Sequence, residues 1–239
     1  MNAGAAVLAG LAGVPVGAFL NVAVERVPDR RPLREGNPAW LGVPVQPWLL
    51  GDRDGPRRRV AVELATAVTF AALAAKWGDT TIVLPMLVLG AALVAVSFVD
   101  LEHLRIPDRL TFPALAVAVP LVVLVSIDRD VTEALRGAVV GSLAYFALLF
   151  VAHLVSPRGM GFGDVKLALL LGLYLGWVGY RDGEEVAGPI EYVFYALMLG
   201  CLLGIVFGLA HRAITRDRSG FPFGPALAVS CVIVLLWVP

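Results

Sequence analysis

Charged residues are scarce in this sequence. Only 16% of its 239 residues are Asp, Glu, Lys or Arg, whereas 59% are hydrophobic; soluble proteins have roughly 25% charged residues. The formal net charge is +0, so the chain lacks the basic excess that favours nucleic-acid binding. We therefore expect no nucleic-acid partner.

Cysteine and histidine are also scarce, with two and three copies respectively. Cys201 and Cys231 lie inside apolar runs, which is typical of small buried side chains rather than of a disulfide or a metal site. His103, His153 and His211 share no metal-ligand spacing and are interpreted as interface or loop residues. We therefore predict no metal ion.

Long apolar runs make up most of the chain. Each is near the ~20 residues that a helix needs to cross a ~30 Å hydrocarbon core, and none alternates apolar and polar residues as barrel strands do. The sequence therefore predicts an all-α, polytopic membrane helix bundle of about eight transmembrane helices. Their approximate bounds are 3–24, 60–75, 81–99, 110–127, 133–154, 164–180, 189–211 and 221–238.

Arginine is concentrated in the longest connection between these runs. We predict three parts: a first transmembrane helix at 1–24, an Arg/Pro-rich loop at 25–59, and a membrane-embedded core of about seven helices at 60–239. With eight spans, most arginines fall on one side of the membrane, and that excess marks the cytoplasmic face. We expect both termini outside, the loop in the cytoplasm, and the chain in the cell inner (cytoplasmic) membrane.

Two aspartates are expected at the same cytoplasmic edge of the membrane. Asp100 follows the third apolar run and Asp164 precedes the sixth, so helix packing could bring them together. Two carboxylates in one low-dielectric site share a single proton. The ionised member can then activate a water while the protonated member donates to a carbonyl oxygen, which suits peptide hydrolysis.

Structural roles compete with catalysis for these carboxylates. Asp108 follows Pro107 and precedes an apolar run, which favours a helix N-cap. Asp164 could also cap its helix. No capping role explains Asp100, because a negative charge is unfavourable at a helix C-terminus. Lys166 could extend its ammonium group to the membrane surface or pair with Asp164.

Two further polar residues lie within or beside apolar runs. Glu63 is near the start of the second run, where the helix dipole favours a carboxylate, and we favour a structural role for it. Asn21 and Glu25 are four residues apart and share a helical face. They could line a site or satisfy each other.

Several motifs together resemble one known family. The spacing of Asp100 and Asp108, the Ile106-Pro107 step and the run Gly161-Phe162-Gly163-Asp164 resemble the type IV prepilin peptidases, which are GxGD-type aspartyl proteases. Residues 17–22, 26–28, 62–64 and 221–225 also resemble family signatures, in the same order. The resemblance thus covers nearly the whole chain.

The resemblance implies both a reaction and a set of site residues. It implies that Asp100 and Asp164 are the catalytic pair, and that the enzyme removes the short basic leader of prepilins or pseudopilins at the cytoplasmic membrane edge. The remaining motif or substrate-binding residues would be Gly161, Gly163, Pro107, Asp108, Lys166, Asn21 and Glu63.

The chain departs from that family in its first loop. Many members carry paired CxxC motifs there, interpreted as a zinc element, and also N-methylate the new terminus with S-adenosylmethionine. Residues 25–59 contain no cysteine, so we predict a protease without zinc and leave methylation open. We expect no cofactor, except S-adenosylmethionine if methylation is retained. The alternatives are another intramembrane aspartyl protease, preflagellin- or presenilin-like, or a small ion-coupled transporter.

Overall fold

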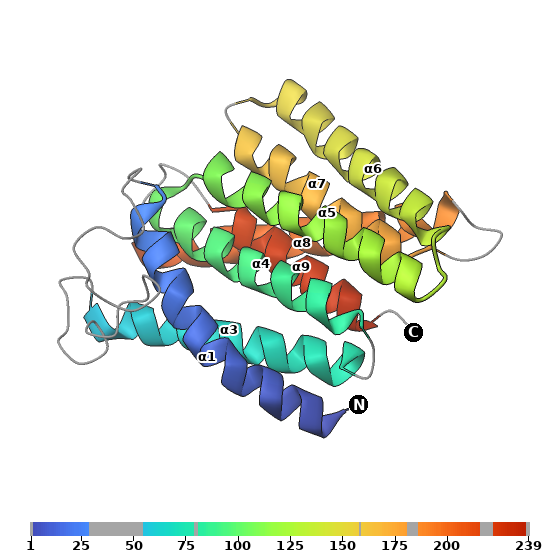
Figure 1. Ribbon diagram of the computed structural model, residues 1–239. Coiled ribbons are helices and arrows are strands. Elements are labelled where there is room, and N and C mark those ends of the chain that lie inside the picture. Colours follow the sequence, from blue (N-terminus) through green and yellow to red (C-terminus); the bar gives the residue numbers. More distant parts are fainter. Residues whose placement is uncertain are drawn as a thin grey trace. The chain divides into compact units, whose positions relative to one another are not determined.

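The computed structural model describes residues 2–28, 55–78, 81–157, 159–180, 186–215 and 222–237. All regular structure in these ranges is helical, which confirms the predicted all-α class (Figure 1). The helices are α1 (Ala3–Arg26), α3 (Gly55–Trp77), α4 (Val83–His103), α5 (Asp108–Asp128), α6 (Ala134–Val155), α7 (Phe162–Val178), α8 (Ala187–Thr215) and α9 (Gly224–Trp237).

Six of the described helices are long and apolar enough to cross a membrane: α1, α3, α4, α5, α6 and α8. At 1.5 Å per residue, the 21 residues of α4 extend about 31 Å, close to the hydrocarbon thickness of about 30 Å. The helix α7 has 17 residues and α9 has 14. These lengths and compositions establish a multi-pass helical membrane protein.

Most helix ends, including the start of α3 and the end of α4, differ by one to five residues from the approximate predicted bounds. The helix α3 begins at Gly55, inside the predicted loop, and residues 29–54 of that loop lie outside the described residues. The helix α4 continues three residues beyond Asp100 to His103. Leu104 then has a φ of 50°, a left-handed conformation that non-glycine residues rarely adopt, and this residue ends the helix.

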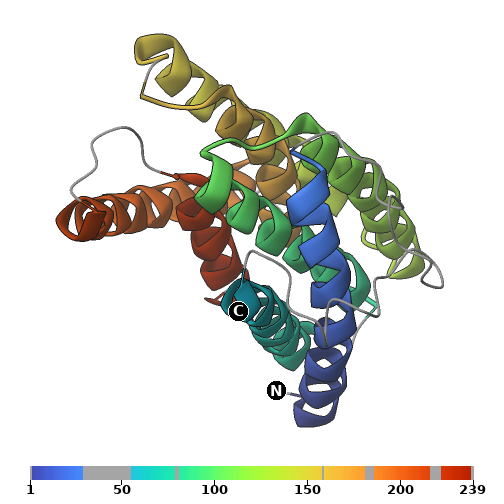
Figure 2. The ribbon, with the colours of Figure 1, turned by 90° about the vertical axis from the view of Figure 1, so that its left-hand side faces the viewer.

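The chain divides into two compact units, Met1–Val99 and Asp100–Pro239. In the first unit, α1 and α3 lie side by side along their lengths (Figure 2). Gly13 and Gly17 make this approach possible, because a Cβ on either would lie 2.7 Å from a Cα of α3. Ala9, Phe70 and Ala74 form a buried cluster in this unit.

In the second unit, α6 and α7 form the most extensive helix pair (Figure 1). Gly137 faces Gly176, and Gly141 faces Gly172; a Cβ on Gly137 or Gly141 would lie 2.5 Å from the carbonyl oxygen of its partner. Small residues four apart let helix backbones touch, which is how helices associate in lipid. This antiparallel pair holds the start of α7, where Asp164 lies, beside the end of α6.

Candidate active site

Asp100 lies in the last turn of α4 and is only 5% exposed. The C-terminal end of a helix disfavours a negative charge, so the carboxylate needs a compensating donor. The backbone N–H of Gly224 supplies it, donating to Asp100 Oδ2 over 2.9 Å. Gly224 is the first residue of α9, and its N–H has no partner within that helix.

Asp164 is the third residue of α7 and is 7% exposed. The N-terminal end of a helix favours a carboxylate, and the backbone N–H of Gly161 also donates to this one. The other oxygen, Oδ1, is buried and has no hydrogen-bond partner among the described residues. Buried polar atoms are normally paired, so this oxygen lacks the partner that a buried carboxylate oxygen usually has.

The structure brings the two predicted aspartates together. Their carboxylates lie within electrostatic range of each other, although they belong to helices separated in the chain by α5 and α6. Both side chains are buried, and two nearby carboxylates in a low-dielectric environment hold one proton between them. This arrangement can supply a general base and a general acid to the same reacting group.

Glycines bring the backbone close to both aspartates. A Cβ on Gly161 would lie 3.2 Å from Asp164 Oδ2, and a Cβ on Gly224 would lie 2.9 Å from Asp100 Oδ2. A Cβ on Gly163 would lie 2.8 Å from the Cβ of Ile106, which is itself buried. Ile106 also comes within 3.2 Å of a Cβ on Gly224 and therefore packs between the starts of α7 and α9.

Neither Asp108 nor Asp164 is the N-cap residue of its helix, so the predicted N-cap position is wrong for both. The N-caps of α5 and α7 are Pro107 and Gly161, and neither helix has a side-chain cap. Both aspartates lie inside the first helical turn. The Asp108 carboxylate instead accepts two hydrogen bonds from Lys166 Nζ, at 2.7 and 2.8 Å.

Lys166 joins the starts of α5 and α7. The sequence left open whether it pairs with Asp164, and the structure places it on Asp108. Its ammonium group also lies 5.7 Å from the ring centre of Phe112 on α5 and 5.1 Å from that of Phe162 on α7. The ion pair and the rings thus link the segments that follow Asp100 and precede Asp164.

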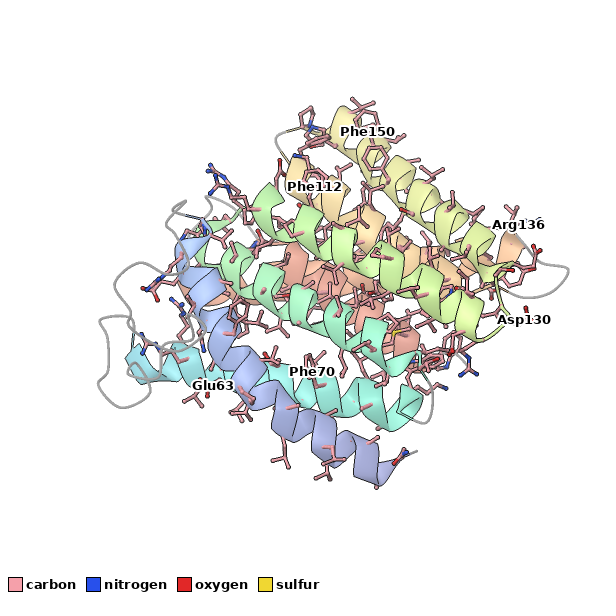
Figure 3. The ribbon with its side chains drawn as sticks, viewed as in Figure 1. Glu63, Phe70, Phe112, Asp130, Arg136 and Phe150 are labelled. Carbon is pink, nitrogen blue, oxygen red and sulfur yellow. The ribbon has the colours of Figure 1, made fainter. Side chains whose placement is uncertain are left out.

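Asn21 and Glu63 belong to the first unit. The side-chain amide of Asn21 donates to the carbonyl oxygen of Arg59 over 3.3 Å, and Arg58 donates to the backbone oxygen of Asn21 over 3.4 Å. The Cα of Glu63 lies against Gly17, and its side chain is half-buried on α3 (Figure 3). These contacts fix the α1–α3 packing; a substrate role for either residue stays a prediction.

Sequence reasoning missed the contact roles of Gly224 and Ile106. Gly224 is separated from Asp100 by 124 residues, so no local spacing predicts their hydrogen bond. Both residues did lie inside motifs that the sequence singled out, at 221–225 and Ile106-Pro107. A glycine or proline just before an apolar run could have indicated these contacts, because such residues often stand where the backbone comes close to another group.

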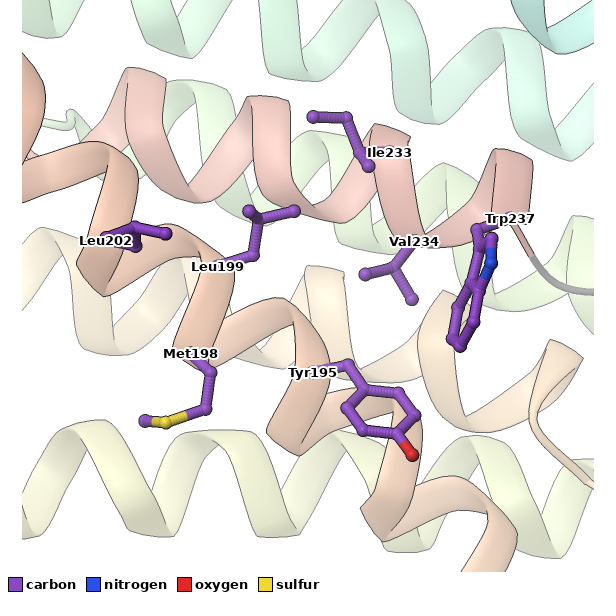
Figure 4. Close-up of a pocket in the computed structure, with 7 residues that line it drawn as sticks. All are labelled: Tyr195, Met198, Leu199, Leu202, Ile233, Val234 and Trp237. Carbon is purple, nitrogen blue, oxygen red and sulfur yellow. The ribbon is translucent and has the colours of Figure 1, made fainter.

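An apolar pocket of about 370 Å³ lies between α8 and α9 (Figure 4). The rings of Tyr195 and Trp237 meet there at 5.6 Å, and the Tyr195 hydroxyl donates to Glu191. No carboxylate lines this pocket, so it is not the site of acid–base chemistry. Its lining residues are Tyr195, Met198, Leu199, Leu202, Ile233, Val234 and Trp237.

No group of three or more His, Cys, Asp or Glu side chains in the described part of the chain is arranged to hold a metal ion. Cys201 and Cys231 are free thiols in α8 and α9. The predicted absence of a zinc element concerns the first loop, of which residues 29–54 lie outside the described ranges. It therefore stays a prediction from the sequence.

Comparison with known proteins gives one consistent result. Residues 87–209, which include both aspartates, match the model of the type IV leader peptidase family. A prepilin leader peptidase/N-methyltransferase of Pseudomonas aeruginosa is 30% identical over 95% of this chain and 88% of its own length. A relative with the same name from Pseudomonas putida is 28% identical over 96% of this chain and 90% of its own length. Another from Aeromonas salmonicida is 34% identical over 80% of this chain and 63% of its own length. No solved structure matches the chain.

Proposed function

Because the chain belongs to the type IV leader peptidase family, we propose that it is a prepilin leader peptidase. It hydrolyses the peptide bond between the basic leader and the apolar N-terminal helix of a type IV prepilin or pseudopilin. The names of the relatives, prepilin leader peptidase/N-methyltransferase, support this substrate class. The reaction takes place at the cytoplasmic edge of the inner membrane, where a membrane-embedded enzyme meets the start of an apolar helix.

The mechanism we propose is that of an aspartyl protease, with Asp100 and Asp164 as the catalytic pair. The single observation that carries it is the meeting of these two buried carboxylates from separate helices within electrostatic range. One carboxylate takes a proton from water as the water attacks the scissile carbonyl carbon. The other donates its proton to the carbonyl oxygen. As the C–N bond of the tetrahedral intermediate breaks, the first carboxyl group passes its proton to the leaving amine, and the second takes a proton back from a hydroxyl of the intermediate, which becomes the carboxylic acid product.

The neighbouring residues have supporting roles in this proposal. Gly161 lets the Asp164 carboxylate lie close to the backbone, and Gly163 lets Ile106 pack against the start of α7. Pro107 is the N-cap of α5, in the connection that follows Asp100. The pairing of Asp108 with Lys166 fixes the relative positions of two segments of the site. All of these residues lie in the second unit of the chain.

The proposal is limited to hydrolysis. The relatives' names include N-methyl transfer, which requires a methyl donor such as S-adenosylmethionine. The pocket between α8 and α9 does not fit the adenosine of that donor, which has many hydrogen-bonding groups. The polar side-chain groups in its lining are the Tyr195 hydroxyl and the Trp237 indole, and the hydroxyl already donates to Glu191. We therefore derive no step through this cofactor.

The transporter alternative has less support. Ion coupling typically uses ionisable residues near the middle of spans or in broken helices at the midplane. Asp100 and Asp164 are the buried ionisable carboxylates of the described residues, and both lie within a turn of a helix end. Paired carboxylates at one membrane edge suit attack on a peptide bond beside the bilayer better than transport across it.

The test is cleavage of a co-expressed prepilin in membranes by the wild type, Asp100→Asn and Asp164→Asn. Loss of a general acid or base costs about 10²–10⁴-fold, so we expect each variant to lose at least about 100-fold in cleavage rate. Asp128→Asn is the matched control, since Asp128 is the exposed last residue of α5. Normal processing by either active-site variant, at wild-type protein levels, would refute the dyad.

A further inference from the structure

His153 lies in the last turn of α6, and its contacts reach the segment that leads to Asp164. The helix α6 ends at Val155 and α7 begins at Phe162. The ring nitrogen Nδ1 of His153 is 2.9 Å from the carbonyl oxygen of Met160. Met160 directly precedes Gly161, the N-cap of α7, so this contact holds the connection two residues before the helix begins.

The direction of this hydrogen bond follows from its chemistry. A carbonyl oxygen can only accept, so Nδ1 must carry the proton and donate. The bond therefore requires a nitrogen donor at this position on the side chain. The next links lie within the backbone: the N–H of Asp164 donates to the carbonyl oxygen of Gly161 over 3.2 Å, and the Gly161 N–H donates to the Asp164 carboxylate.

The imidazole ring makes a second contact with α7. Its centre lies 5.3 Å from the ring centre of Phe162, the first residue of that helix. Phe162 in turn meets Phe150 at 6.4 Å and lies beneath the ammonium group of Lys166. His153 thus contacts both the connection and the first turn of α7, and Asp164 belongs to that turn.

We propose that His153 is a positioning residue for Asp164: its hydrogen bond to Met160 fixes the Gly161 segment and so aims the Asp164 carboxylate at Asp100. This inference rests on the proposed peptidase function, in which Asp164 is catalytic. Misplacing a catalytic group by about 1 Å can cost on the order of 100-fold in rate. Loss of the hydrogen bond should therefore lower kcat and leave substrate binding largely unchanged.

A merely structural role makes a different prediction. The α6–α7 pair is already held together by the facing glycines 137, 141, 172 and 176. If His153 only added to that packing, every substitution that loses the ring or the bond would lower stability and activity together. A positioning role instead depends on the donor nitrogen and not on the ring.

Two substitutions separate the donor from the ring. His153→Asn keeps a nitrogen donor at nearly the position of Nδ1 but has no ring, whereas His153→Phe keeps an aromatic ring and has no donor. Ser142→Ala is the matched control. Its hydroxyl donates to the carbonyl oxygen of Leu169 over 2.9 Å, so this variant also loses one side chain–backbone bond between α6 and α7, but far from the start of α7.

The experiment measures cleavage of a solubilised prepilin by the purified full chain, with hydrogen exchange at the amides of Gly159, Met160 and Asp164. These amides donate within the segment, to Ser156 and Gly161. We expect His153→Phe to lower kcat by about tenfold or more, with KM within about twofold, and to speed this exchange. The kcat of His153→Asn should stay within about threefold of the wild-type value. Ser142→Ala should have the same kcat and the same amide exchange as the wild type.

Two results would overturn the positioning role. One is a wild-type kcat for His153→Phe, even if its exchange is faster. The other is an equal loss of activity and thermal stability in His153→Asn and His153→Phe, which would indicate packing alone. If the wild type itself does not cleave prepilin, the proposed function fails, and exchange in the two variants still decides whether the His153 donor anchors the segment.

Discussion

The two aspartates reach the same site from opposite kinds of helix end. Asp164 lies at the start of α7, where the dipole and nearby N–H groups stabilise a carboxylate. Asp100 lies at the end of α4, where the dipole opposes one, and it depends on the start of α9 for a donor. A single backbone N–H, that of Gly224, therefore has a large influence on the position of Asp100.

We predict that Gly224→Ala lowers cleavage activity without destabilising the fold. Gly224 is helical, and alanine is the better helix former by about 1 kcal/mol. The added Cβ, however, would lie 2.9 Å from Asp100 Oδ2 and 3.2 Å from Ile106 Cδ1, so the carboxylate must move away from its donor. We expect a loss of about 10- to 100-fold in kcat, measured on purified enzyme together with thermal unfolding.

The control for this substitution is Gly4→Ala. A Cβ at Gly4 meets only Asn2 Oδ1, at an ordinary 3.6 Å, and we expect wild-type cleavage. Unchanged kcat in Gly224→Ala would show that Asp100 tolerates displacement or does not act in the reaction. A large drop in unfolding temperature would attribute the loss to folding instead.

At the residue scale, the sequence predicted the two aspartates but not their partners. Charges at the ends of apolar runs are conspicuous, and this is why Asp100 and Asp164 could be found. The capping interpretation of Asp108 failed because a residue just before an apolar run can be either the N-cap or the first helical residue. The Asp108 carboxylate pairs with Lys166, which is 58 residues away. Local sequence patterns cannot predict a partner at that separation.

At the scale of elements, the ion pair between Asp108 and Lys166 connects the first turns of α5 and α7. Its carboxylate side chain is 53% exposed and its ammonium side chain 23%, so solvent screens much of the attraction. We predict a coupling of about 0.5–1 kcal/mol in a double-mutant cycle of Asp108→Asn and Lys166→Met. Thermal unfolding in detergent should show shifts of about 2–4 °C.

A second ion pair provides the comparison. Glu133 and Arg136 meet at 2.9 Å within one turn at the start of α6, with side chains 53% and 60% exposed. Because this pair joins no two helices, its cycle of Glu133→Gln and Arg136→Met should give a smaller coupling, about 0.3–0.5 kcal/mol. Equal couplings in the two cycles would mean that the α5–α7 link adds nothing beyond a surface ion pair.

Hydropathy predicted which segments form helices, but not which helices pack together. Apolar runs are interchangeable in lipid, since lipid tails are as apolar as the side chains. The α6–α7 pairing depends on shape instead, through glycines spaced four apart on both helices. That spacing was present in the sequence and would have been the signal for this pair.

At the scale of the whole molecule, composition alone predicted a multi-pass helical membrane protein. The predicted number of spans rests on α7 and α9 as well, which are shorter than the six spanning candidates. The orientation of the protein in the membrane is predicted from the arginines between α1 and α3. An even number of membrane crossings between that connection and the candidate active site would put both on the same side. The helices α3 and α4 separate that connection from the α4–α5 turn, and α5 and α6 separate that turn from the start of α7.

Each of these four helices is long enough to span. We predict that all four cross the membrane, which would put the three connections on one side of it. We predict that this side is cytoplasmic, because it holds the arginine excess. Alkaline phosphatase fused after Gly55 should be inactive. Fused after Arg129, which follows three further crossings by α3, α4 and α5, it should be active. The opposite result would place Asp100 and Asp164 at the outer edge, away from the basic leader of a newly made prepilin, and the proposed reaction could not take place there.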